Sequence, residues 1–307
     1  MRLFVMNKGE NFMDKVGVIG LGDMGSGLAK NLLENGYDTI GFDLSHERMT
    51  SFQLMGGASA VSVKDVAQKV KTVFIMVMTG DQAESVIFND GLADHLTEGA
   101  TIILTATIKP SEAIRIGYRL KNFTVNLIDS PVSGGFPGAQ AGTLTMMAAG
   151  SETALKKNKK VMEAVSKTIH HVGVKPGDGQ TVKACLQSLI GSIFSATFEA
   201  STLAAKAGIS GEVLFKVFST SGASSGVSNT ALENIIDRKF EGTGSHISTM
   251  HKDLTIVLDL AQELGVPLHT ASTAMQLFHA GKTKFPDGDN WIVTKVLEDI
   301  VGVELHR

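Results

Sequence analysis

The sequence contains a single cysteine, Cys185, so no disulfide can form within the chain and no cluster of thiolates can hold a metal. The fold must therefore be held by packing, and 43% hydrophobic against 19% charged residues is a composition that can bury a large core. We expect a reducing compartment, the cytoplasm. We also expect the cysteine to be a small buried residue of a helix, since no histidine lies near it in the sequence.

The chain also lacks a surplus of positive charge. Lys and Arg number 28 against 31 Asp and Glu, a formal net charge of −3, which argues against binding to nucleic acid. No run approaches the roughly 18 uninterrupted apolar residues of a membrane span. Residues 1–14 lack the apolar block of a signal peptide, and we expect them to form an N-terminal tail. These absences predict a soluble protein that is not secreted.

Short apolar runs alternate with amphipathic stretches from Lys15 to about Gly173, which is typical of a parallel sheet with helical crossovers. The predicted strands are residues 16–20, 39–43, 72–78, 101–105, 124–128, 144–149 and 168–172. The predicted helices are residues 24–34, 63–70, 82–88, 111–119 and 152–165.

The pattern changes after the turn-rich segment 175–179, where strand signals stop and a domain boundary is expected between residues 176 and 177. Residues 180–207 lack proline and are mostly small or apolar, which predicts a helix of about 40 Å. Such a helix must be covered on several sides, by two domains or by a second subunit. Further helices are predicted at residues 211–218, 231–238, 251–264, 270–280 and 291–301. The chain is thus an α/β domain over residues 15–176, followed by an all-α domain over residues 177–307.

A glycine-rich loop follows the first predicted strand. Its G-x-G-x-x-G pattern consists of Gly20, Leu21, Gly22, Asp23, Met24 and Gly25. The first glycine permits a tight turn, the second lets the backbone approach a pyrophosphate, and the third allows close helix packing. The free N–H groups of the next helix then face the phosphates. The loop predicts dinucleotide binding, although the bare pattern also fits a strand-to-helix turn without a ligand.

The cofactor is predicted from an acidic residue at the end of the second strand. Asp43 lies 23 positions after Gly20, where its carboxylate can accept both ribose hydroxyls and repels a 2′-phosphate. Ser45, His46 and Arg48 are close by and leave NADP as the less favoured alternative. We therefore expect NAD.

A second glycine cluster follows the strand predicted at residues 124–128. It reads Asp-Ser-Pro-Val-Ser-Gly-Gly over residues 129–135. Backbone N–H groups and a serine hydroxyl in such a segment can converge on a carboxylate, on the side of the sheet where ligands bind. The alternative from composition is a mobile surface loop.

Lys183 lies in the predicted first turn of the long helix, with Gln187 one turn later on the same face. The helix macrodipole and apolar surroundings both lower the pKa of a lysine there, which suits it to proton transfer near neutral pH. The alternative is an exposed lysine at a frayed helix end.

Together these motifs resemble the β-hydroxyacid dehydrogenase family, which includes 3-hydroxyisobutyrate, tartronate semialdehyde and threonate dehydrogenases. The resemblance covers residues 15–301 and rests on both glycine motifs, on Gly179 with Lys183, and on the Lys-Asp-Leu segment 252–254. It implies a Rossmann-type domain joined by the long helix to an all-helical domain, and assembly as a dimer or tetramer.

The resemblance also implies roles for individual residues. Lys183 is the implied proton-transfer residue. The implied substrate-binding residues are Ser133, Gly134, Gly135 and Gln187. Outside the glycine loop and Asp43, the implied cofactor-binding residues are Met78, Thr79, Thr107 and Lys252. No metal ligand is implied.

The sequence departs from the family at positions that bear on the substrate. Leu186 and Gln187 replace two asparagines that often follow the lysine, and a glutamine resembles the threonate-type branch, which usually has a histidine before it. Small residues fill 221–226, where relatives often have a tryptophan, and Ala106 replaces a common serine.

We interpret the chain as an NAD-dependent oxidoreductase that interconverts a small β-hydroxy acid, of the 3-hydroxyisobutyrate, glycerate or threonate type, and its aldehyde or keto acid. An imine or semialdehyde reductase on the same scaffold and a non-catalytic NAD-binding protein are the alternatives.

Overall fold

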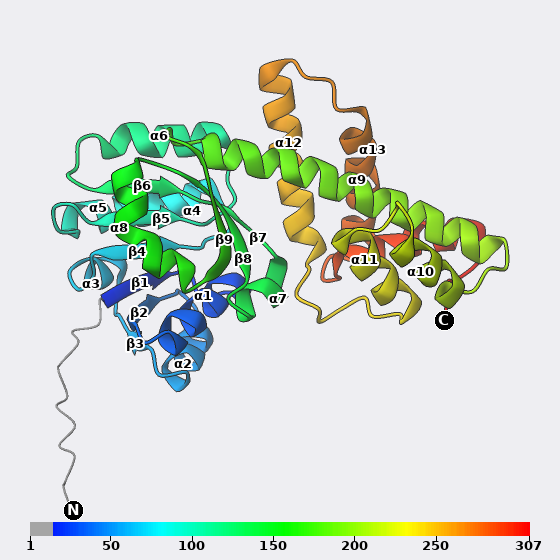
Figure 1. Cartoon of the computed structure of the whole chain (residues 1–307), viewed down its shortest axis with the longest axis horizontal. Coiled ribbons are helices and arrows are strands. Elements are labelled where there is room, and N and C mark those ends of the chain that lie inside the picture. Colours follow the sequence, from blue (N-terminus) through cyan, green and yellow to red (C-terminus); the bar gives the residue numbers. More distant parts are fainter. Residues whose placement is uncertain (1–14) are drawn as a thin grey trace, which may run out of the picture.

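The structure is a computed structural model that describes residues 15–307, so the predicted tail, residues 1–14, lies outside the described residues. A sheet-containing domain and a helical domain lie side by side, and helix α9 (Asp178–Lys206) runs across both (Figure 1). The predicted fold class is confirmed: an α/β Rossmann-type domain is followed by an all-α domain.

The first domain is built on a nine-stranded sheet with the order β3-β2-β1-β4-β5-β6-β8-β7, and β9 pairs with β8. The strands are β1 Lys15–Ile19, β2 Asp38–Phe42, β3 Ala58–Ser59, β4 Thr72–Ile75, β5 Thr101–Leu104, β6 Asn126–Asp129, β7 Val132–Ser133, β8 Leu144–Ala149 and β9 Ser166–Gly173. All ladders from β3 to β6 are parallel, and β8 runs antiparallel to both β6 and β7. The carboxyl ends of β1, β4, β5 and β6 therefore lie at one edge, where open α/β sheets bind ligands.

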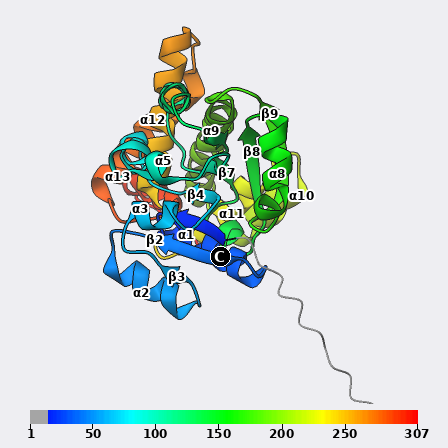
Figure 2. The same ribbon diagram turned by 90° about the vertical axis from the view of Figure 1, so that its left-hand side faces the viewer.

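Helices cover both faces of this sheet, which is why its strands are continuous apolar runs. The helices are α1 Asp23–Glu34, α2 His46–Leu54, α3 Val63–Ala67, α4 Gly80–Glu84, a π-helix Ser85–Asn89, α5 Leu92–His95, α6 Pro110–Leu120, α7 Gly135–Gln140 and α8 Glu152–Glu163. Helices α3, α5 and α6 pack on one face, and α1, α7 and α8 pack on the other. Figure 2 shows α3 and α5 on one side of the sheet and α8 on the other.

The predicted elements differ from the structure mainly at their ends. Strand β4 stops at Ile75 rather than residue 78, because Thr79 already caps α4, accepting a hydrogen bond from the backbone N–H of Gln82 at 3.2 Å. Helix α2 and strand β3 were not predicted, since His46–Leu54 has a weak apolar pattern and only Phe52 of it is buried.

In the described residues, the second domain packs five α-helices and one 3₁₀ helix around α9. They are α10 Gly211–Thr220, α11 Gly226–Ile236, α12 Ile247–Leu264, α13 His269–Lys284, a 3₁₀ helix Asn290–Val293 and α14 Thr294–Val301. Phe194 of α9 stacks on Phe198, with ring centroids 6.0 Å apart, and meets Trp291 at 6.2 Å. Helix α12 approaches α9 closely at Gly191, where a Cβ atom would lie 2.8 Å from the Leu254 side chain. This approach places α12 beside the face of α9 that carries Lys183 and Gln187.

The opposite face of α9 is exposed. Cys185 lies on it, so the prediction of a buried cysteine is wrong: the buried residues 180, 183, 184, 187 and 191 follow helical periodicity and leave position 185 outside. Leu189 and Leu203 are exposed on the same helix. Of the helices in residues 15–307, none has the length and apolar character to cross a membrane.

Candidate active site

The glycine loop is shaped by contacts that only glycine permits. Gly20 has φ +88°, and a Cβ atom on it would lie 2.2 Å from the carbonyl oxygen of Met76. A Cβ on Gly25 would lie 1.8 Å from the carbonyl oxygen of Gly20. Gly22 precedes α1 without a side-chain cap, so the first N–H groups of the helix are open to an anion. The loop fits a dinucleotide pyrophosphate.

Two other residues of the loop have structural contacts. Leu21 is buried, and its backbone N–H donates to Oδ2 of Asp43 at 2.7 Å. Met24 is partly buried against the core beneath α1. Asp23, the first residue of α1, is half-exposed.

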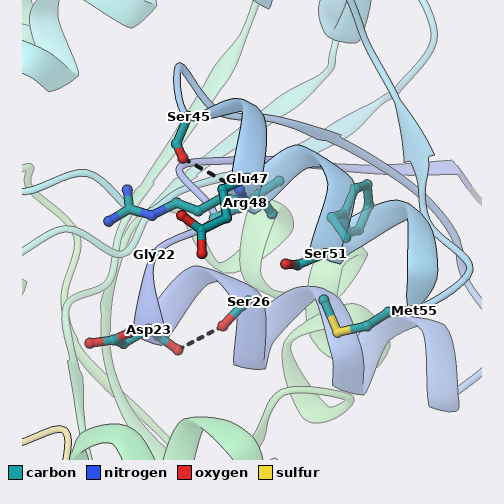
Figure 3. A pocket seen from close by; sticks show the side chains of 10 residues that line it. Gly22, Asp23, Ser26, Ser45, Glu47, Arg48, Ser51 and Met55 are labelled. Carbon is teal, nitrogen blue, oxygen red and sulfur yellow. Dashed lines mark hydrogen bonds between the residues drawn. The ribbon is translucent and has the colours of Figure 1, made fainter.

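Asp43 follows β2, and its carboxylate is fixed against the loop. Oδ1 accepts from the backbone N–H of Ser45 at 2.8 Å, and Oδ2 lies 3.5 Å from Nη1 of Arg48. The carboxylate and the guanidinium thus stand together at the end of the sheet where the adenosine ribose binds in this fold. A pocket of about 480 Å³ opens here between α1 and α2, with Arg48, Gly22 and Asp23 along it (Figure 3).

The second glycine motif lies in regular secondary structure, at the junction of β7 and α7. Ser133 ends β7, which pairs with β8. Gly134, with φ +129°, caps the start of α7, and Gly135, with φ +58°, is the first residue of that helix. Asn31 of α1 donates from Nδ2 to the carbonyl oxygen of Ala139 in α7 at 2.8 Å. The helices that follow the two glycine motifs therefore pack directly together.

Lys183 is buried within the domain junction. Helix α9 begins at Asp178, so Lys183 lies in its second turn rather than in the first, and only 6% of the residue is exposed. Burial lowers the pKa of its ammonium, and the positive charge of Lys252 lowers it further. The negative charge of Asp253 acts in the opposite direction and raises this pKa. The alternative of an exposed lysine at a frayed helix end is wrong.

Residues of α12 surround this lysine. Asp253 accepts a hydrogen bond at 2.5 Å from Nε2 of Gln187, one turn after Lys183. Its other oxygen lies 3.0 Å from the ammonium of Lys252. The Lys252 ammonium also donates to the carbonyl oxygen of Thr107 at 2.6 Å. The structure thus brings together predicted residues from both domains.

A buried carboxylate anchors the start of α9. Asp129 ends β6 with 0% exposure and accepts from the backbone N–H of Gly177 and from Nε2 of Gln180, both at 2.8 Å. Gln180 also donates to the carbonyl oxygen of Ala106 and accepts from the N–H of Ile108, each at 3.0 Å. Burial raises the pKa of Asp129 to about 6, although these hydrogen bonds to its carboxylate lower it in part. The network fixes the helix that carries Lys183 to the loop that carries Thr107.

Met78 and Thr79 lie at the same edge of the sheet, after β4. Met78 is 52% exposed, and the backbone N–H groups of both residues donate to Oε1 of Gln82 at 2.9 and 3.3 Å. The segment just before this pair runs beside the glycine loop, because the Met76 N–H donates to the carbonyl oxygen of Ile19, the residue before Gly20.

Sequence reasoning assigned no role to Asp129, Gln180 or Asp253. A polar residue at the carboxyl end of a parallel strand was an available signal for Asp129. Asp253 belongs to the Lys-Asp-Leu segment that carries the resemblance, and no local pattern marks Gln180. Both residues acquire their partners only through tertiary packing.

A dinucleotide-binding sheet, a buried lysine and the facing α12 cluster define a class: an NAD(P)-dependent dehydrogenase that acts on CH–OH groups. Comparisons with known proteins agree with this class. The family model described as the NAD binding domain of 6-phosphogluconate dehydrogenase matches residues 15–173. The model described as "NAD-binding of NADP-dependent 3-hydroxyisobutyrate dehydrogenase" matches residues 177–297. The chain belongs to the β-hydroxyacid dehydrogenase family.

Individual relatives cover nearly the whole chain. It is 33% identical to L-threonate dehydrogenase of Escherichia coli K12, over 96% of this chain and 98% of that protein. It is 30% identical to NAD-dependent L-serine dehydrogenase of Pseudomonas aeruginosa, over 94% and 100%. A solved structure of 3-hydroxyisobutyrate dehydrogenase from Salmonella typhimurium superposes with a TM-score of 0.85 at 33% identity, over 92% and 99%.

Proposed function

We propose that the protein oxidises a small hydroxy acid with a further hydroxyl group, of the glycerate or threonate type, to the aldehyde or keto acid with NAD⁺, and runs the reverse reduction. The observation that carries the chemistry is the burial of Lys183, which favours its neutral amine. A neutral amine next to a substrate hydroxyl is a general base.

The residues have distinct tasks in this reaction. Bound NAD⁺ supplies the acceptor for the hydride that leaves the carbinol carbon. The Lys183 amine takes the hydroxyl proton and becomes an ammonium, so a C=O group forms as the C–H and O–H bonds break. The Ser133 hydroxyl with the N–H groups of Gly134 and Gly135 holds the substrate carboxylate, and Lys252 fixes the loop at Thr107 on the nicotinamide side.

The choice of a polyhydroxylated substrate rests on the orientation of Gln187. A carboxylate only accepts hydrogen bonds, so the side-chain atom that faces Asp253 must be Nε2. The Gln187 Nε2 also lies 3.7 Å from Sδ of Met250, whereas its Oε1 bonds to nothing in residues 15–307. A fixed acceptor one turn from Lys183 favours a substrate that brings a hydroxyl donor.

NAD is the proposed cofactor because Asp43 holds its carboxylate rigidly, through Leu21 and Ser45, where a 2′-phosphate would have to bind. The positive charge of Arg48 is directed at the same carboxylate. Arg48 is therefore not free to offset the repulsion of a phosphate.

We further propose a homodimer or homotetramer, joined through the exposed apolar face of α9. Leu189 and Leu203 lie on a helix whose other faces are covered by its own chain, and a second copy would remove them from water. Replacing both residues by Asp should lower the mass measured by sedimentation without changing the fold. We place the reaction in the cytoplasm, where the nicotinamide cofactor pool is available.

The test of the function is NAD⁺ reduction followed at 340 nm with L-threonate, D-glycerate and 3-hydroxyisobutyrate, for wild type and Lys183→Ala. We expect turnover of the polyhydroxylated acids and its loss by about 10²–10⁴-fold in the variant, with NAD⁺ binding retained. Unchanged turnover in the variant would refute the role of Lys183. If the wild type binds NAD⁺ but turns over none of the three acids, the proposed substrate class is refuted.

A further inference from the structure

A side-chain hydrogen bond joins the two domains at the glycine loop. Nε2 of His246, the residue before α12, lies 2.8 Å from Oδ2 of Asp23, the first residue of α1. The two residues are 223 positions apart in sequence. The carboxylate can only accept, so the imidazole carries a hydrogen on Nε2 in this contact.

His246 is held in place by its own domain. Buried Asp289 accepts from the N–H and hydroxyl of Thr243, at 2.7 and 2.6 Å, and from the N–H of Ser245 at 3.1 Å. The backbone of His246 forms a β-bridge with Asp289, whose Oδ1 lies 3.7 Å from Nδ1 of the ring. The imidazole is thus presented to the first domain from a fixed segment, unlike a free surface side chain.

The same segment also contacts the residue that directly follows the second glycine motif. Gly244, with φ +75°, packs so closely on Phe136 of α7 that a Cβ atom there would lie 2.7 Å from the Phe136 Cβ. Residues 243–246 therefore touch the first glycine motif at Asp23 and the helix α7 that follows the second one. This part of the helical domain lies at the phosphate end of the cofactor site.

Asp23 stands where a negative charge opposes cofactor binding. The open N–H groups at the start of α1 suit a pyrophosphate, but a carboxylate on the first residue of that helix is an anion beside another anion. We propose that His246 is a cofactor-affinity residue: by pairing with Asp23 across the domains, it offsets the repulsion between this carboxylate and the pyrophosphate. The proposal rests on dinucleotide binding by the glycine loop and is independent of the hydroxy acid.

A double-mutant cycle tests this coupling. Dissociation constants of NAD⁺ and of ADP-ribose are measured by calorimetry at low salt for wild type, His246→Ala, Asp23→Ser and the double variant. We expect His246→Ala to weaken both ligands about fivefold to tenfold, because the Asp23 charge is then unopposed. We expect Asp23→Ser to bind more tightly than wild type, and the His246→Ala change to have less than about a twofold effect in that background.

Three further readouts separate electrostatic coupling from a structural role. The loss in His246→Ala should shrink as KCl is raised to 1 M, since screening acts on charge and not on packing. The matched control is His306→Ala, which removes another exposed histidine paired with a carboxylate, Glu304 at 3.3 Å, and should leave both affinities unchanged. Melting temperatures should stay close to wild type, because exposed ion pairs contribute little stability.

Three results would overturn the proposal. The first is no loss of affinity in His246→Ala. The second is an equal loss in the Asp23→Ser background, which would mean that the histidine acts independently of this carboxylate. The third is a loss for NAD⁺ but not for ADP-ribose, which would place the effect at the nicotinamide and away from the pyrophosphate. If the wild type binds NAD⁺ with normal affinity but oxidises none of the three hydroxy acids, the result contradicts the proposed substrate class and leaves this proposal standing.

Discussion

The ammonium of Lys252 donates to the carbonyl oxygen of Thr107 at 2.6 Å, although the two residues are 145 positions apart and belong to different domains. The contact draws α12 against the loop that follows β5, and Asp253 extends it to Gln187 of α9. Gln180 ties the same loop to the start of α9. Lys183 therefore lies between two anchors on its own helix, one turn before it and one turn after it, and both lead to the Thr107 loop.

The pH dependence of oxidation should reflect the lowered pKa of Lys183. Its ammonium is inactive as a base, and burial favours the neutral amine, so the rate should rise with pH through a midpoint below the ordinary lysine value of 10.5. The measurement is kcat/KM for the best hydroxy acid between pH 6 and 10. The rate of the reverse reduction should fall over the same range, because that direction needs the ammonium as the acid. A midpoint at or above the ordinary lysine value would contradict the prediction.

Asp129 should make the protein less stable as the pH rises. Its pKa is about 6 in the folded chain and near 3.8 in the unfolded chain, so the folded state binds this proton more tightly. The stabilisation relative to Asp129→Asn is full below the lower value and is lost as pH rises through the upper one, by on the order of 3 kcal/mol. Urea unfolding of both proteins between pH 4 and 7.5 measures this difference. A difference that stays constant with pH would mean that burial does not perturb this carboxyl.

Asp43→Ser should shift the cofactor preference toward NADP. The substitution removes the charge that repels a 2′-phosphate and frees Arg48 to bind it, so the ratio of NAD⁺ to NADP⁺ affinities should fall about tenfold or more. Arg48→Ala in the same background is the control, and it should cancel the gain in NADP⁺ affinity. An unchanged ratio in Asp43→Ser would mean that other residues select the cofactor.

Gln187→Met should separate the substrates. Methionine has a similar length but no oxygen, so kcat/KM for glycerate and threonate should fall about 10–100-fold, whereas 3-hydroxyisobutyrate, which lacks a second hydroxyl, should change little. Calorimetry should give an unchanged NAD⁺ affinity. An equal loss on all three acids would instead indicate that Gln187 maintains the packing of α9 on α12.

The sequence alone determined the local features of this protein. Alternating apolar runs predicted the parallel sheet because strands buried on both faces must be apolar, and the boundary of the helical region followed from the loss of that pattern. The glycine loop was recognisable because two of its glycines, Gly20 and Gly25, sit against backbone carbonyl oxygens that leave no room for a side chain. The second glycine motif and Lys183 also stood out from the residues themselves, and the resemblance to the family then added Lys252 and the individual roles.

Tertiary structure alone decided the partners. Whether Lys183 is buried or exposed depends on α12 and on the junction between the domains, and neither is encoded near residue 183. The contacts of Asp253 with Gln187 and of His246 with Asp23 join residues 66 and 223 positions apart. Such contacts leave no periodicity in the sequence, because a side chain's charge and hydrogen bonds depend on what packing brings within about 3 Å of it, and only the folded chain sets that distance.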